Sequence, residues 1–95
     1  MIDQSEWDEA KGEANFRKHG VDFDTATLVF TDPFAMDRLD ECAAYSEIRL
    51  LITGMADGVL LTVVYTERGE VVRIISTSRA TKKEHDDYYR QNAQE

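Results

Sequence analysis

The stretch GVLLTVVYTERGEVVRIISTS, residues 58–78, decides the fold of this 95-residue chain. Both of its halves are dense in β-branched and aliphatic side chains, which is typical of strands and too apolar for a surface helix. Arg68-Gly69 separates the halves, and glycine is common in tight hairpin loops. The pattern predicts two antiparallel strands, over residues 58–67 and 70–78, joined by a two-residue turn at Arg68-Gly69.

The strand pattern continues toward the N-terminus. SEIRLLITG, residues 46–54, has the same β-branched and apolar composition, and Asp57-Gly58 between it and residue 59 favours a second hairpin. PFAMDRL, residues 33–39, is expected to add an edge strand. We therefore expect an antiparallel sheet of about four strands, one face of which can remain open to water or to a ligand.

Capping signals predict two helices before the sheet. Asp8 can cap a first helix that runs to about Lys18, and Gly20 fits the left-handed position that commonly follows a helix. A second helix is expected to begin at Asp22. It stops before Pro33, because the residue ahead of a proline disfavours helical geometry.

A third helix is predicted after the sheet. Thr81-Lys82-Lys83-Glu84 has the spacing of a capping box, and the helix is expected to run to about Asn92. The resulting order, two helices, four strands and one helix, is that of an α+β fold. At this length, residues 1–95 are expected to form a single domain.

Composition limits the classes of function. The net charge of −8 argues against non-specific nucleic-acid binding, which depends on neutralising phosphates with Lys and Arg. The lone Cys42 excludes an intramolecular disulfide and suits a reducing compartment. No apolar run reaches the length of a membrane span, and the N-terminus lacks a signal-peptide pattern. A cytoplasmic protein with no membrane partner is expected.

Cationic side chains nevertheless cluster, first on the predicted N-terminal helix. At about 100° per residue, Lys11, Asn15, Lys18 and His19 fall within one arc of about 100°. This arc could face an anion. Alternatively, it is a solvated face on which the last-turn cations complement the helix dipole.

Two more cationic positions lie in the hairpin. With a turn at Arg68-Gly69, Val64 faces Arg73, which then shares a face with Thr66. Arginine suits phosphate because its planar guanidinium donates two parallel hydrogen bonds and stays charged. The alternative is a turn arginine in a surface ion pair with Glu67 or Glu70.

A third group, Arg79, Lys82 and Lys83, lies at the start of the last helix, where free backbone N–H groups can bind phosphate. The alternative is a plain strand-to-helix connection with solubilising lysines. No metal is expected, because His19, His85 and Cys42 have no recognised ligand spacing. No glycine-rich phosphate-binding motif is present, and no cofactor is expected.

The order and spacing of these residues resemble the BrnT family of bacterial toxin–antitoxin ribonucleases. The most specific parts are W-D-x-x-K-x-x-x-N-x-x-K-H-G over Trp7–Gly20, D-P at Asp32-Pro33, and T-x-R…R-I-I-S over Thr66–Ser76. The resemblance covers nearly the whole chain.

The resemblance implies a RelE-like fold and metal-independent cleavage of RNA, with inhibition of translation and growth. It also implies neutralisation by a ribbon-helix-helix antitoxin similar to BrnA, encoded alongside. Toxin and antitoxin together would repress their own operon, and the toxin would contact DNA only through the antitoxin.

Site roles follow from the same resemblance. Metal-free cleavage requires deprotonation of the 2′-OH, stabilisation of the phosphorane and protonation of the 5′-oxygen. His19 would shuttle protons, and Lys18 and Arg68 would stabilise the phosphate. The implied catalytic set is Lys18, His19, Arg68 and Arg79, and the implied RNA-binding set is Lys11, Asn15 and Arg73.

One departure from the family pattern concerns the end of the last strand. Family members usually carry arginine where this chain has Ser78, and here the arginine follows at Arg79. A one-residue shift in a strand turns a side chain to the other face. Either Arg79 reaches the site from the strand end, or a phosphate-binding group is missing. The second case predicts a weakened homologue that acts mainly as antitoxin partner and co-repressor.

Overall fold

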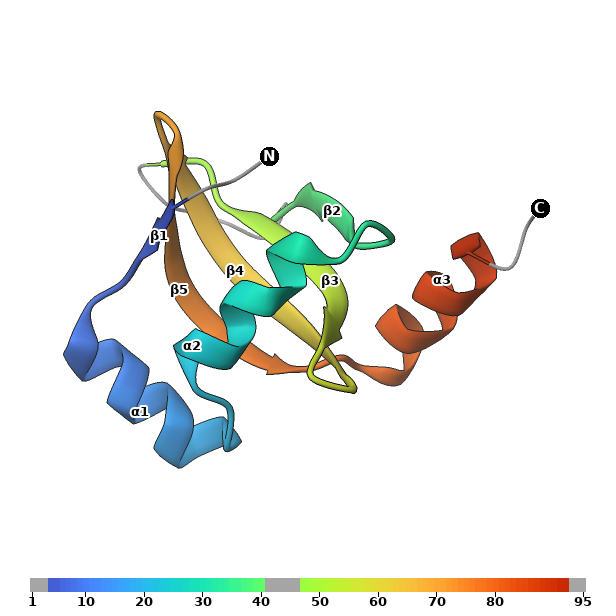
Figure 1. Ribbon diagram of the computed structural model, residues 1–95, viewed down its shortest axis with the longest axis horizontal. Coiled ribbons are helices and arrows are strands. Elements are labelled where there is room, and N and C mark those ends of the chain that lie inside the picture. The colour runs from blue at the N-terminus through green and yellow to red at the C-terminus, as the bar shows by residue number, and fades with distance from the viewer. Residues whose placement is uncertain (1–3, 41–46, 93–95) are drawn as a thin grey trace.

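The computed structural model describes residues 4–40 and 47–92, and its elements form one mixed sheet with helices (Figure 1). The strand order is β1-β5-β4-β3-β2, antiparallel except for the parallel pair β1–β5. Helices α1 and α2 lie on one face of the sheet, and α3 lies to the side of β3. In chain order the elements are β1 Gln4–Glu6, α1 Glu9–His19, α2 Phe23–Ala26, the 3-10 helix η1 Thr27–Thr31, β2 Met36–Leu39, β3 Leu50–Ala56, β4 Val59–Arg68, β5 Val71–Arg79 and α3 Lys82–Asn92.

The α+β class and the four antiparallel strands are confirmed, and the structure adds a fifth strand. β1 has only three residues, QSE, with no apolar alternation, so it carries no strand signal of its own. It forms by pairing with β5, with Glu6 beside Arg73. This parallel pair makes the sheet mixed and covers the first part of the outer edge of β5.

The predicted hairpin turn is wrong by one residue. Arg68 is the last residue of β4 and pairs with Val71, so the loop is Gly69-Glu70. Gly69 has a φ of 63°, the left-handed region that a tight loop requires at its first position. As a consequence Arg73 faces Thr66 and not Val64.

β5 also contains a bulge that no sequence pattern signalled. Val64 pairs with Ser76 whereas Tyr65 pairs with Ile74, so Ile75 is the extra residue. A bulge reverses the alternation of faces along the bulged strand. Ile74, before the bulge, and Thr77, after it, both point to the helix-covered face. Their neighbours Arg73 and Ser78 therefore both point to the opposite face.

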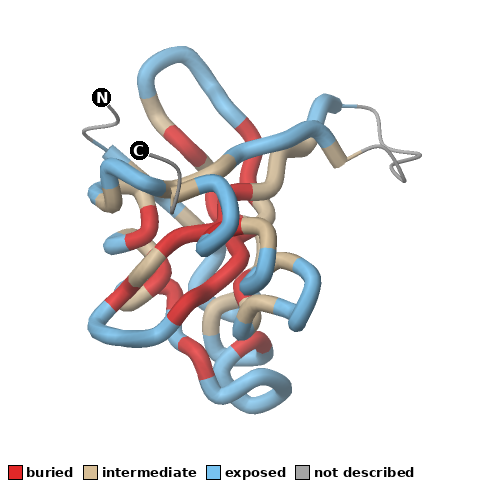
Figure 2. The backbone as a smooth tube through the Cα atoms, turned by 90° about the vertical axis from the view of Figure 1, so that its right-hand side faces the viewer, coloured by how far each residue is buried: buried red, intermediate tan, exposed pale blue. Residues whose placement is uncertain are grey.

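The hydrophobic core lies between the sheet and the segment that contains α2 and η1, and the buried stretches of the chain gather near the centre of the molecule (Figure 2). The buried residue of α1 itself is the polar Asn15. The predicted helix beginning at Asp22 is confirmed, but its second half is 3-10. Phe30 from η1 packs edge-on against Tyr65, with 5.0 Å between ring centroids. Gly54 permits η1 to lie this close, because a Cβ there would come within 3.0 Å of Val29.

The ends of α1 agree with the prediction. The Asp8 carboxylate accepts hydrogen bonds from the backbone N–H groups of Ala10 and Lys11. Gly20 follows His19 with a φ of 73° and donates its N–H to a carbonyl of the last turn. The left-handed Gly20 turns the chain back toward α2.

Asn15 attaches α1 to β5. Its side chain is buried, and its amide nitrogen donates to the carbonyl oxygens of Val21 at 3.0 Å and Thr77 at 2.9 Å. Its amide oxygen accepts the N–H of Thr77 at 3.1 Å. The side chain therefore pairs with Thr77 as a neighbouring strand would, on the stretch of the β5 edge that β1 does not reach.

The predicted capping box and C-terminal helix are confirmed. α3 is attached to the rest of the molecule through Asp32, which accepts the hydroxyl of buried Tyr88 at 2.7 Å and the N–H of Met55 at 2.8 Å. Burial would raise the pKa of Asp32, but these hydrogen bonds and one from Phe34 outweigh it and lower the pKa. Within the described ranges, no helix is long and apolar enough to cross a membrane.

We predict that Asn15→Ala lowers the free energy of unfolding by about 2–4 kcal/mol, because it leaves buried backbone groups of Thr77 and Val21 unpaired. Urea denaturation followed by circular dichroism measures this. Asn92→Ala is the matched control, since its amide bonds to Phe34 and Tyr88 lie at the exposed end of α3. Equal destabilisation by the two variants would contradict the role assigned to Asn15.

Candidate functional site

The face of the sheet opposite α1 and α2 carries two of the predicted arginines. Arg73 on β5 stands directly opposite Thr66 on β4, and Arg68 points to the same face two residues further along β4. Such diagonal neighbours lie roughly 7–8 Å apart at Cβ, within the reach of two long side chains. Thr66 is 1% exposed, and its hydroxyl has no hydrogen-bond partner in the part of the chain that the structure describes.

Both arginines are engaged by surface carboxylates. Arg73 Nη1 lies 3.0 Å from Glu6 Oε2, and Arg68 Nη2 lies 3.5 Å from Glu47 Oε1. The side chains of these pairs are between 32% and 52% exposed, so each pair contributes only about 0–1 kcal/mol. A phosphate could replace either carboxylate at little cost. Arg68 thus forms a surface ion pair, but its partner is Glu47 and not the expected Glu67 or Glu70, and this pair does not exclude phosphate binding.

The other end of this face is held by Glu84, the first-turn acid of α3. Its carboxylate accepts three hydrogen bonds of 2.8 Å, from Arg38 on β2, the hydroxyl of Thr62 on β4 and the N–H of Thr81. The hydroxyl hydrogen of Thr62 is used in the hydrogen bond to Glu84. In the 2.7 Å hydrogen bond between the hydroxyls of Thr53 and Thr62, Thr53 is therefore the donor. The sequence indicated only the capping role of Glu84.

The carboxylate of Glu84 is ionised in this setting. Burial on its own would raise its pKa, but hydrogen bonds from Arg38, Thr81 and Thr62 outweigh burial and lower the pKa below the usual 4.5. The hydrogen-bonded group of Glu84, Arg38 and Thr62 thus fixes α3 against β2 and β4. It also lies beside Ser78, which pairs with Thr62 across the strands.

The predicted cationic arc on α1 is divided by its contact with the sheet. Asn15, near the centre of the arc, faces β5. Viewed down the helix axis, Lys11 and Lys18 are rotated from Asn15 by about 40–60° to one side, and His19 is rotated by about 40° to the other. All three flanking side chains are exposed. Both amide hydrogens of buried Asn15 are used in its bonds to backbone carbonyls, and its oxygen already accepts one hydrogen bond. This geometry favours a supporting role, in which Asn15 positions α1, and direct contact of Asn15 with RNA stays a prediction.

The structure does not bring Lys18 and His19 to the arginine pair. α1 runs along β5 with Asn15 level with Thr77, and Thr77 pairs with Val63. Arg68 lies five residues beyond Val63 on β4, about 16 Å away at 3.3 Å per residue. Lys18 and His19 lie still further toward the C-terminal end of α1. Lys11 lies on the other side of Asn15 along α1, nearer to the level of Arg73 on β5.

Arg79 lies on the opposite face of the sheet from Arg68 and Arg73. It pairs with Leu61 on the helix-covered face, and it lines a small cavity of about 140 Å³ together with Gly20, Val21 and Asp22. The bulge at Ile75 causes this placement, because regular alternation would have placed Arg79 on the face of Arg73. The corresponding position on the face of Arg73 is occupied by Ser78.

The remaining candidates add no further chemistry. In the described residues, no group of three His, Cys, Asp or Glu side chains could hold a metal ion. His85 is an exposed residue of α3 that packs against Tyr89, with 4.8 Å between ring centroids. Lys82 and Lys83 form exposed ion pairs within α3, which supports their interpretation as solubilising residues. Cys42 lies outside the described residues.

Because the pKa of Glu84 is lowered, we expect its contribution to the stability of the fold to depend on pH. A group whose pKa is lowered on folding stabilises the protein above its unfolded-state pKa, and this contribution is lost as the pH falls through the folded-state pKa. We expect Glu84→Gln to lower the free energy of unfolding by about 1–2 kcal/mol at pH 7. The difference from wild type should shrink below the usual pKa of 4.5.

Denaturation curves between pH 3 and pH 8 test this expectation. Glu70→Gln is the control, because Glu70 is an exposed loop residue with no ion pair among the described residues. A deficit of Glu84→Gln that is the same at every pH would show that the carboxylate charge is not what stabilises the fold.

Comparison with known proteins identifies the family. The family model described as the ribonuclease toxin BrnT of the type II toxin–antitoxin system matches residues 7–84. No curated protein matches the chain. Because the match covers most of the sequence, the chain belongs to the BrnT family of ribonuclease toxins.

Proposed function

We propose that this BrnT-family toxin cleaves RNA without a metal ion, using the sheet face opposite α1 and α2 to hold the reacting phosphate. The observation that supports this most directly is the placement of Arg68 and Arg73 on that face, beside the buried hydroxyl of Thr66. Two guanidinium groups within reach of each other suit a phosphodiester, because each can donate two hydrogen bonds to phosphate oxygens.

The proposed reaction is an internal phosphoryl transfer. The 2′-oxygen of one nucleotide attacks the adjacent phosphorus, the bond to the 5′-oxygen breaks, and the products end in a 2′,3′-cyclic phosphate and a 5′-hydroxyl. Arg68 and Arg73 would stabilise the charge that accumulates on the phosphorane oxygens, which is the largest contribution a metal-free site can make.

The residues of α1 take a different part in this proposal. Lys11, nearer to Arg73, would bind a phosphate next to the reacting one. Lys18 and His19, at the far end of α1, would contact the RNA further along the seam between α1 and β5. Because His19 is distant from Arg68, it can shuttle protons at the arginine pair only if the RNA-bound protein changes shape. Otherwise water carries the protons, and cleavage is slow.

Family membership and charge together support a proposal about the partners. We propose that a ribbon-helix-helix antitoxin neutralises this toxin and that the complex represses its own operon. A chain with a net charge of −8 has little long-range attraction for DNA, which fits an arrangement in which the antitoxin makes the DNA contacts.

A second candidate function rests on Ser78. This position lies on the face of Arg73, while Arg79 lies on the other face, so one cationic group is missing from the proposed phosphate site. A toxin with a weakened site would act mainly as the antitoxin's partner and as a co-repressor. The two candidates differ in whether purified protein cleaves RNA at a rate sufficient to arrest growth.

Alanine substitutions test whether the catalytic site lies at Arg68 and Arg73 or near Arg79, at the C-terminal end of α1. We expect Arg68→Ala and Arg73→Ala each to lower the rate of RNA cleavage at least about tenfold, measured with a labelled RNA in buffer containing EDTA. Arg79→Ala is the matched control and should stay within about threefold of wild type. Loss of activity in Arg79→Ala with retention in the other two would move the site to the C-terminal end of α1.

Restoring the missing arginine tests the second candidate. We expect Ser78→Arg to raise the cleavage rate at least about fivefold, because it adds a guanidinium to the face of Arg73. The double variant Ser78→Arg/Arg73→Ala should lose this gain if the two groups bind the same phosphate. An unchanged rate in Ser78→Arg would mean that the serine does not limit activity.

A further inference from the structure

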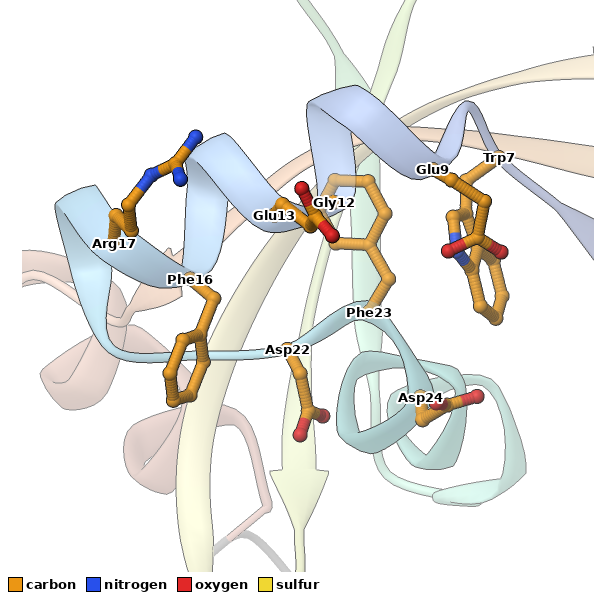
Figure 3. A pocket seen from close by; sticks show the side chains of 9 residues that line it. All are labelled: Trp7, Glu9, Gly12, Glu13, Phe16, Arg17, Asp22, Phe23 and Asp24. Carbon is orange, nitrogen blue, oxygen red and sulfur yellow. The ribbon is translucent and has the colours of Figure 1, made fainter.

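A groove with an aromatic floor lies between α1 and the start of α2 (Figure 3). It is on the helix-covered side of the molecule, whereas Arg68 and Arg73 lie on the other face of the sheet. Its volume is about 480 Å³, and its aromatic residues are Trp7, Phe16 and Phe23. Trp7 and Phe23 pack edge-to-face, with 5.9 Å between their ring centroids. Phe16 is 53% exposed, which is unusual for a large apolar side chain beside two others.

The rim of this groove is acidic. Glu9 and Glu13 project from α1, and Asp22 and Asp24 from the start of α2, against a single cation, Arg17 (Figure 3). None of these carboxylates forms an ion pair with another described residue. Asp22 is the N-cap of α2, and one of its oxygens accepts the N–H of Thr25. The groove therefore combines an apolar floor with a largely uncompensated negative rim.

The charge of the rim decides between possible occupants. RNA is excluded from this groove, because its phosphates would face four carboxylates. A second copy of this chain is disfavoured, since it also carries a net charge of −8. A positively charged amphipathic segment satisfies both features, with an apolar side chain against Phe16 and Lys or Arg against the rim. The 11 residues of α1 span about 16 Å, enough to contact three turns of such a helix.

We propose that this groove binds a cationic amphipathic helix of the antitoxin, anchored by an apolar side chain that packs on Phe16. The inference rests on the proposed function in that it takes the partner to be the antitoxin. Since the groove and the arginine pair lie on opposite sides of the sheet, this contact holds the antitoxin without occupying the phosphate site. Inhibition then requires a further part of the antitoxin to reach the other face.

The test uses the full-length chain and the antitoxin purified as the product of the neighbouring reading frame. Isothermal titration should show Phe16→Ala weakening the affinity at least about tenfold, as expected for a central aromatic anchor. Phe34→Ala is the matched control, because Phe34 is 57% exposed and lies outside the groove. Glu13→Lys should also weaken binding and reduce its dependence on salt concentration.

Each result bears on the inference. Wild-type affinity in both Phe16→Ala and Glu13→Lys would overturn it, as would no binding by the wild-type protein. A wild-type dimer, detected by light scattering and abolished by Phe16→Ala while antitoxin binding persists, would assign the groove to self-association and overturn it as well. Circular dichroism confirms that the variants are folded.

RNA cleavage, measured in parallel, separates this inference from the proposed function. The groove variants should cleave RNA at the wild-type rate, and loss of cleavage in folded Phe16→Ala would overturn the assignment of separate surfaces. If no protein in the series cleaves RNA but Phe16→Ala still loses antitoxin, the groove assignment stands and the proposed ribonuclease activity fails.

Discussion

The contact between Asn15 and the backbone of Thr77 determines how the helices meet the sheet. β1 covers the outer edge of β5 only as far as Arg73, so the backbone groups beyond that point need another partner. The Asn15 amide supplies both a donor and an acceptor, and its second N–H secures the chain that leaves α1 at Val21. Because a buried amide is costly to leave unpaired, this contact holds α1 in a single orientation. The direction of every other side chain on α1 follows from it.

Two chemically different surfaces result from this arrangement. On the sheet face without α1 and α2, the pairing of Thr66 with Arg73 brings the hairpin arginines together. On the other side, α1 and α2 enclose a groove whose rim is acidic. The net charge of −8 is thus unevenly distributed, with paired arginines on the proposed phosphate-binding face and largely unpaired carboxylates around the proposed antitoxin groove. A toxin that must bind both RNA and an antitoxin needs two such surfaces.

Local chemistry explains what could be predicted. The strands follow from dense β-branched composition, and the helix ends at Asp8, Gly20 and Thr81 follow from capping residues that act within a few positions of themselves. The family resemblance implied a catalytic role for Arg68 and an RNA-binding role for Arg73, and the structure brings these two arginines to one face. The resemblance also grouped Lys18 and His19 with Arg68, and the structure places these two residues far from it along α1. The difference arises because motif order carries no information about distance across a sheet.

The sequence by itself determined the α+β class and the order of the elements from α1 to α3, because these depend on residue patterns within short windows. It also determined the family, through the order and spacing of motifs along the chain. Only the tertiary structure decided which side chains share a surface. The bulge at Ile75 turned Arg79 away from Arg73 and left Ser78 in its place, and the loop at Gly69-Glu70 set Arg73 opposite Thr66. A one-residue change of register reverses a strand's faces, and register is set by the pairing of distant segments, which no local pattern records.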